Sequence, residues 1–194
     1  MHCCRFTAGG LPNLAALAAR LEQLRIEQQI EMWHVVGHDG GCAVAVHYPR
    51  LFPQRIGCLG LLTPSMFPEL KPFYPFEALR IPVIGELVAP MINLIFWRVA
   101  MPLAVRGNRD TVRDSHAPFR GLRGPWRLMS LVRWGDPTEL LASIPRLLPE
   151  ILAPTLIFHG AADSAVPEAF ARRACELDAR LGVDPSELGP FFFP

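Results

Sequence analysis

Residues 37–41 read GHDGG and place a single carboxylate, that of Asp39, among three glycines. The apolar residues 31–36 before it predict a strand, and the small and apolar residues 42–47 after it predict a helix. A strand that turns at once into a helix around G-x-X-x-G holds residue X in a strained conformation with its side chain exposed. The next backbone N–H, that of Gly40, then faces the ligand. A carboxylate is ionised at neutral pH, so Asp39 could attack a carbon atom without help from a base.

A second acid, Asp163, follows the apolar segment PTLIFHG at residues 154–160. This segment is predicted to be a short buried strand, as are residues 31–36 and 56–62. Helices are predicted over residues 14–29, 42–47 and 166–177. Such alternation predicts a parallel α/β sheet, in which ligands meet the carboxyl ends of the strands. We therefore expect Asp39 and Asp163 at the ends of neighbouring strands, facing one cleft.

Residues 63–150 are predicted to form short helices interrupted by proline and glycine. Many of the 20 prolines of the chain lie there. Within them, the apolar run at 81–105 is long enough to suggest a membrane span. Glu86, Arg98 and three prolines argue against a span, because each charge is costly in hydrocarbon. We expect a buried or cleft-lining helical segment instead.

The bulk composition is that of a globular protein. The 194 residues are 51% hydrophobic, and 19 basic side chains nearly balance 18 acidic ones. Nothing in this balance favours nucleic acid or a charged membrane surface as a partner. The first residues lack the apolar core of a signal peptide, and the scattered cysteines match no zinc spacing. We expect a cytoplasmic protein with no metal and no cofactor; its cysteines are Cys3, Cys4, Cys42, Cys58 and Cys175.

Three stretches carry a family resemblance: the GHD turn, YPRLFPQRI after the predicted helix, and APTLIFHGAADSAVP around Asp163. In these three stretches the chain resembles the α/β-hydrolase superfamily. Aspartate at position X, preceded by histidine, resembles the haloalkane dehalogenase and epoxide hydrolase branch. The resemblance implies a partial α/β-hydrolase core at residues 1–67 and 151–194, with a helical cap at 68–150. It also implies a carbon–halogen or epoxide bond in a small apolar substrate, with Asp39 as the nucleophile.

In this family a histidine activates water in the second step, and Asp163 would orient that histidine. Ester hydrolysis is a weaker expectation, because attack by Asp39 on an acyl carbon would leave an anhydride.

The chain departs from the family pattern in several ways. The last histidine, His159, precedes Asp163, so no residue fills the place of the general base. The family's strands before the first helix, with an HG-type loop, are also missing, and the chain looks truncated at both ends. Gly40 stands where such dehalogenases usually carry tryptophan. Epoxide hydrolases of this kind use cap tyrosines, and the chain has only Tyr48 and Tyr74.

These departures leave alternatives open. Asp39 could be a structural turn carboxylate, and Asp163 a solvated loop acid. The chain could be a binding or interaction protein that has lost turnover, or a fragment without stable activity. His116 of the insertion could hang over the cleft, but a solvated loop histidine is the favoured interpretation. A small parallel sheet leaves two unpaired edges, so we expect marginal stability and allow for a homo-oligomer that covers them.

Overall fold

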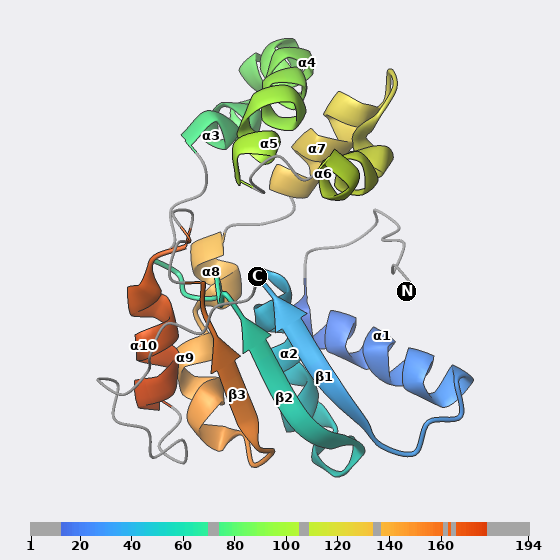
Figure 1. The fold of residues 1–194 in the computed structure, drawn as a ribbon, viewed down its shortest axis with the longest axis vertical. Helices are drawn as coiled ribbons and strands as arrows, with labels where there is room; N and C mark the ends of the chain where they lie inside the picture. The colour runs from blue at the N-terminus through green and yellow to red at the C-terminus, as the bar shows by residue number, and fades with distance from the viewer. Residues whose placement is uncertain are drawn as a thin grey trace. The chain divides into compact units, whose positions relative to one another are not determined.

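The computed structural model describes residues 13–69, 74–104, 109–133, 137–160, 163 and 166–177 (Figure 1). Cys3 and Cys4 lie outside these ranges. In chain order the helices and strands are α1 (Leu14–Glu27), β1 (Trp33–His38), α2 (Gly41–Leu51), β2 (Ile56–Leu62), α3 (Tyr74–Arg80), α4 (Ile84–Ile95), α5 (Met101–Ala104), α6 (Arg109–His116), α7 (Gly124–Val132), α8 (Pro137–Leu141), α9 (Ile144–Leu147), β3 (Thr155–Phe158) and α10 (Glu168–Leu177). The chain divides into two compact units: the helical unit, Lys71–Asp136, and the sheet unit, made of the segments on either side of it.

The three strands form one parallel sheet in the order β1-β2-β3, which confirms the predicted α/β class. His38, Leu62 and Phe158 lie opposite one another near the carboxyl ends of the strands. Helices α2 and α9 lie behind the sheet in Figure 1, and no described helix crosses its front. The carboxyl ends of all three strands therefore point toward the same end of the sheet unit.

The prediction of buried strands is wrong for one face of β1 and β3, whereas every residue of β2 is buried or half-buried. Burial alternates along β1, and Val36 is 65% exposed on the open face. Leu156 of β3 pairs with Gly60 in the same row and is 58% exposed. The reason is that the described helices cover one face only, whereas parallel sheets are normally covered on both.

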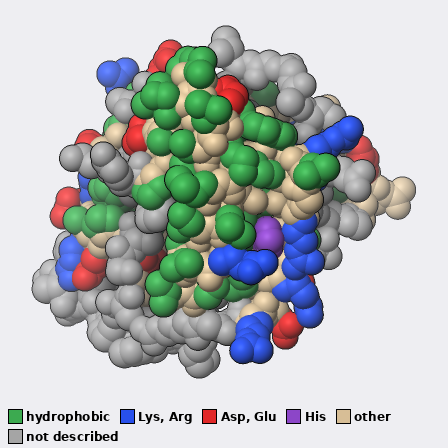
Figure 2. Space-filling view, turned by 90° about the horizontal axis from the view of Figure 1, so that it is seen from above, with side chains coloured by type: hydrophobic (Ala, Val, Ile, Leu, Met, Phe, Trp, Pro, Cys, Tyr) green, Lys and Arg blue, Asp and Glu red, His purple; other side chains and the backbone are tan. Residues whose placement is uncertain are grey.

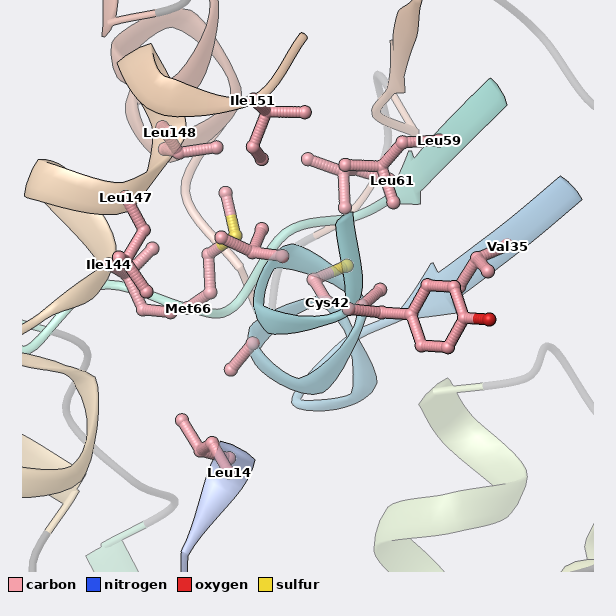
Figure 3. Packing of buried hydrophobic residues seen from close by; sticks show 14 of the residues in the cluster. Leu14, Val35, Cys42, Leu59, Leu61, Met66, Ile144, Leu147, Leu148 and Ile151 are labelled. Atoms are coloured by element: carbon pink, nitrogen blue, oxygen red, sulfur yellow. The ribbon is translucent and has the colours of Figure 1, made fainter. Parts of the chain in front are cut away.

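The other face of the sheet carries the core of the sheet unit. Figure 3 shows Met66 between Ile144 of α9 and the turns of α2. Helices α8 and α9, at residues 137–147, thus pack with the sheet, whereas the sequence placed residues 68–150 in the insertion. Their buried residues are Leu141, Ile144 and Leu147.

The helical unit has a small core of its own, made by Leu79, Ala89, Ile92 and Leu128. Its longest helical stretch, Ile84–Leu103, is long and apolar enough to cross a membrane by length and composition, and 28% of it is buried. The prediction was a buried or cleft-lining segment: burial is wrong for one side of this stretch, whereas Asn93, Leu94 and Trp97 of the same stretch line a cavity. Large apolar side chains are exposed there at Ile84, Leu87, Met91, Leu94, Ile95, Val99 and Leu103.

Polar side chains connect helix α2, which follows the Asp39 turn, to helix α1. The buried Tyr48 hydroxyl donates a hydrogen bond of 2.6 Å to Glu22, and Arg25 pairs with the same carboxylate at 2.7 Å. The hydrogen bond from Arg25 lowers the pKa of Glu22 to about 2; burial opposes this shift, and the bond from Tyr48 adds to it. The ionised form of Glu22 is thus the one that stabilises the contact between α1 and α2.

Glu22→Gln is expected to lower the free energy of unfolding at neutral pH. The folded-state pKa lies below the ordinary value of 4.5, so the wild-type advantage is fully present above pH 4.5. It should disappear as the pH falls toward 2. Urea unfolding of the wild type and of Glu22→Gln between pH 2 and 7 measures the difference in their free energies of unfolding. The contributions of the other titrating groups cancel, because both proteins contain them. A difference that does not change with pH would contradict the proposed role of the charge.

Candidate active site

Asp39 occupies the turn between β1 and α2 that the glycine pattern predicts. Its φ is 53°, in the left-handed region that residues other than glycine rarely adopt. The Asp39 N–H donates to the Leu62 oxygen at 3.0 Å, and the Cys42 N–H donates to the Asp39 oxygen at 3.0 Å. These bonds hold the strained backbone while the residue itself stays exposed. Strain of this kind is concentrated at functional sites, where surrounding structure maintains it.

The glycines around Asp39 have different roles. A Cβ atom on Gly37 would lie 2.7 Å from the Cα of Cys42 and 2.9 Å from the Cβ of Ala45, so only glycine allows α2 to approach β1 this closely. Gly40 has a φ of −58° and open space where a Cβ would be. Its N–H donates no hydrogen bond within the described part of the chain. No described residue therefore occupies the predicted backbone donor.

Ser65 is a site residue that the sequence did not identify. Its hydroxyl donates a hydrogen bond to Oδ1 of Asp39, and the residue is only 4% exposed. Among the described residues, the Oδ2 atom of Asp39 has no hydrogen-bond partner. Ser65 thus holds one oxygen of the carboxylate and leaves the other available for attack. No pattern in the sequence marks a serine three residues beyond a strand.

Asp163 does not lie on a strand next to that of Asp39, so the prediction of neighbouring strands is wrong. Asp39 follows β1 and Asp163 follows β3, and β2 separates these two outer strands. Asp163 accepts a hydrogen bond from the Val166 N–H at 3.1 Å, and its own N–H donates to the Gly160 oxygen at 2.9 Å. Both bonds shape the loop that leads into α10.

No described histidine is hydrogen-bonded to the Asp39 carboxylate. His38 ends the exposed row of β1, and His159 follows β3 with its Nδ1 atom buried and unpartnered. His47 donates to a backbone oxygen one turn earlier in α2 at 2.8 Å, and burial lowers its pKa. His116 belongs to the helical unit. The contacts of these histidines identify no replacement for the missing base.

Cys42 is excluded as an alternative nucleophile. Burial raises the pKa of its thiol to about 12, so the thiolate is absent at neutral pH. The thiol lies 3.5 Å from the Leu62 oxygen, to which it donates. The described residues contain no group of three or more histidine, cysteine or acidic side chains that could hold a metal ion. Asp39 therefore remains the candidate nucleophile at this turn.

Solved structures resemble this chain over most of its length. A haloalkane dehalogenase from Bradyrhizobium elkanii superposes with a TM-score of 0.65 over 88% of the chain, at 20% sequence identity. A meta-cleavage product hydrolase from Pseudomonas fluorescens does so with a TM-score of 0.62 over 88%, at 16% identity. An ancestral haloalkane dehalogenase gives a TM-score of 0.64 over 89%, at 23% identity. The chain has the α/β-hydrolase fold.

The chain covers 65%, 62% and 67% of these three structures, respectively, so it carries about two thirds of an α/β-hydrolase chain. No protein-family model matches it, and no curated protein sequence matches it. Proteins with the α/β-hydrolase fold catalyse different reactions, as the dehalogenases and the meta-cleavage product hydrolase illustrate. The fold therefore does not select the reaction, which must be inferred from the site.

Removal of the Asp39 side chain is expected to reveal the strain of the turn. Asp39→Gly should be more stable than Asp39→Ala by about 1 kcal/mol, because alanine is disfavoured at a positive φ and glycine is not. Both variants lose the hydrogen bond from Ser65, so that loss cancels in the comparison. Urea unfolding of the two variants measures the difference. Equal stabilities would show that the turn is not strained.

Proposed function

We propose that Asp39 is the nucleophile of a hydrolase that acts on a carbon–halogen or epoxide bond of a small apolar molecule. The observation that carries this proposal is the exposed Asp39 carboxylate, presented on a turn with a φ of 53° and held at one oxygen by Ser65. A carboxylate fixed in this way loses little orientational freedom when it attacks.

In the first step Oδ2 of Asp39 forms a bond to carbon, and the carbon–halogen bond breaks with its electron pair leaving on the halide. The product is an alkyl ester of Asp39. For an epoxide, the ring oxygen leaves carbon and takes a proton from water. The N–H of Gly40 is the proposed donor to the leaving group. Ester substrates suit this nucleophile less well, because an anhydride would result.

In the second step water hydrolyses the Asp39 ester. Asp163 is the proposed acid for orienting a histidine base, by analogy with the catalytic triad. No described histidine is hydrogen-bonded to the Asp39 carboxylate, so the chemistry of this chain is expected to be strongest in its first step.

The helical unit, Lys71–Asp136, is proposed to be the cap domain of this hydrolase. Its exposed apolar side chains suit an apolar substrate. A cytoplasmic location is proposed, without a nucleic-acid or membrane partner. The nearly balanced charge favours neither nucleic acid nor a charged membrane surface. A homo-oligomer is proposed as one way to cover the open sheet face, on which Val36 and Leu156 are more than half exposed.

A second candidate function is binding without turnover. Asp163 accepts a backbone hydrogen bond from Val166, as a structural loop acid does. If Asp163 has only that role, the site would retain a carboxylate at a strained turn but would have no system to hydrolyse an ester. Such a protein would bind small apolar molecules near Asp39.

Intact-protein mass spectrometry tests the proposed nucleophile. After incubation with 1-bromobutane or 1,2-epoxybutane, the chain should gain the mass of one alkyl adduct, and peptide mapping should place it on Asp39. Asp39→Asn is the matched control, because its side chain has nearly the same size but is a poor nucleophile. Equal labelling of Asp39→Asn would contradict the proposal. Absence of any adduct would favour binding without chemistry.

A further inference from the structure

The helical unit contains a cavity of about 280 Å³ that none of the proposed chemistry uses. All of its walls come from this one unit. It is at the small end of the range of ligand sites in proteins, so it suits a molecule smaller than a typical drug. The lining residues are Pro90, Asn93, Leu94, Trp97, Arg98, His116, Phe119, Arg120 and Gly121.

The charges around this cavity are all positive. Arg98 and Arg120 line it, and no acidic side chain does. Arg98 forms no ion pair with any described residue, and Arg120 donates only to the backbone oxygen of Arg113, at 3.1 Å. Both side chains are exposed, so their guanidinium groups can reach a bound anion. Figure 2 shows positive side chains gathered beside exposed apolar surface.

Two buried residues of the lining have polar atoms without partners. Asn93 is 9% exposed; its amide nitrogen donates to the Phe119 oxygen at 3.3 Å, and its Oδ1 atom has no partner. Trp97 is 6% exposed, and its Nε1 atom also has no partner. Buried polar groups left unpaired are destabilising, so a ligand or water that reached them would be favoured.

The remaining walls are apolar and aromatic. The Trp97 ring is stacked on His116 at 5.1 Å and on Phe119 at 5.4 Å between ring centroids. Pro90 and Leu94 add aliphatic surface. Burial lowers the pKa of His116, and the charges of Arg120 and Arg98 lower it further. The cavity therefore combines two arginines with walls that are mostly apolar and aromatic.

We propose that this cavity binds a small organic monocarboxylate. Its carboxylate lies between Arg98 and Arg120, and its apolar body lies against Pro90, Leu94 and the aromatic rings. Planar carboxylates match guanidinium groups well, whereas the apolar walls disfavour a phosphate or another strongly hydrated anion. The cavity belongs to the helical unit and Asp39 to the sheet unit, and the proposal does not depend on the proposed reaction.

Calorimetric titration of the full chain with benzoate tests this proposal. One benzoate should bind per chain, and benzyl alcohol, which keeps the ring but lacks the charge, should bind at least about tenfold more weakly. Arg98→Gln combined with Arg120→Gln should weaken benzoate binding by about tenfold or more. The matched control is Arg109→Gln combined with Arg123→Gln, which removes two exposed arginines of the same unit outside the cavity. This control should bind benzoate as the wild type does.

Nuclear magnetic resonance of His116 provides a second readout. A bound carboxylate should raise the pKa of His116, because it offsets the charges of Arg98 and Arg120. The other charged groups on α6 are Arg109, Asp110, Arg113 and Asp114, and both acids pair with Arg113. Asp39→Asn should bind benzoate normally, which separates this site from the proposed function. Equal affinities for benzoate and benzyl alcohol, or unchanged binding by the Arg98 and Arg120 double variant, would overturn the proposal.

Discussion

A purified sample of this chain, incubated with excess 1-bromobutane, is expected to release about one bromide ion per chain and then stop. The first step consumes the Asp39 carboxylate, because its oxygen becomes part of a butyl ester. The ester is hydrolysed only if a base activates water, and no histidine follows Asp163 in the sequence. Ser65 is the only described hydrogen-bond partner of the Asp39 side chain, and a serine hydroxyl is a weak base. Bromide measured over hours against protein concentration gives this ratio.

Two variants separate the steps. Asp39→Asn should release no bromide above the background of buffer alone. Asp163→Asn should release the same single equivalent as the wild type, because Asp163 would act only on the ester. Release of many bromide ions per chain by the wild type would contradict the stalled second step and would show that another residue acts as the base.

The site was predictable from the sequence where it depends on residues close together in the chain. The strained turn is one example, because Gly37 and the strand–helix transition are both local signals. These two signals identified Asp39 as the residue at the turn, and its φ of 53° agrees with the predicted strained conformation. The three strands were found in the same way, from short apolar runs bounded by turn residues.

The rest of the site depends on tertiary packing, which residue spacing does not reveal. Ser65 reaches Asp39 only because β2 pairs beside β1 and the following loop turns back over the site. The position of β2 between β1 and β3 likewise separates Asp39 from Asp163. A periodic pattern shows that a strand is buried or exposed, but not which strand lies beside it.

The apolar content of the helical unit was also misleading about burial. The stretch Ile84–Leu103 was predicted to be buried or cleft-lining. Part of it lines the cavity of the helical unit, yet Leu87 is 76% exposed and Leu103 is 75% exposed. Nearby Glu86 is paired with Arg133. Composition measures how much apolar surface a segment carries, whereas burial depends on what packs against it. Here the neighbouring helices cover only one side.

Gly37→Ala is expected to destabilise the sheet unit strongly, by about 3 kcal/mol. The added methyl group would lie 2.7 Å from the Cα and 2.9 Å from the N of Cys42, both backbone atoms that no rotamer change can move. Helix α2 must therefore shift away from β1, which disturbs the buried contacts of Cys42 and Ala45. The same shift would displace the turn that presents Asp39. Urea unfolding measures the loss of stability, and adduct formation with 1-bromobutane should be lost as well.

Gly40→Ala is the matched control, because the same methyl group is added three residues away at the same turn. No atom lies within 4 Å of its Cβ position, and its φ of −58° suits alanine. Its stability should stay within about 0.5 kcal/mol of the wild type. The backbone N–H of residue 40 remains, so adduct formation should continue. If Gly37→Ala were as stable and as reactive as Gly40→Ala, close packing of α2 on β1 could not be what positions Asp39.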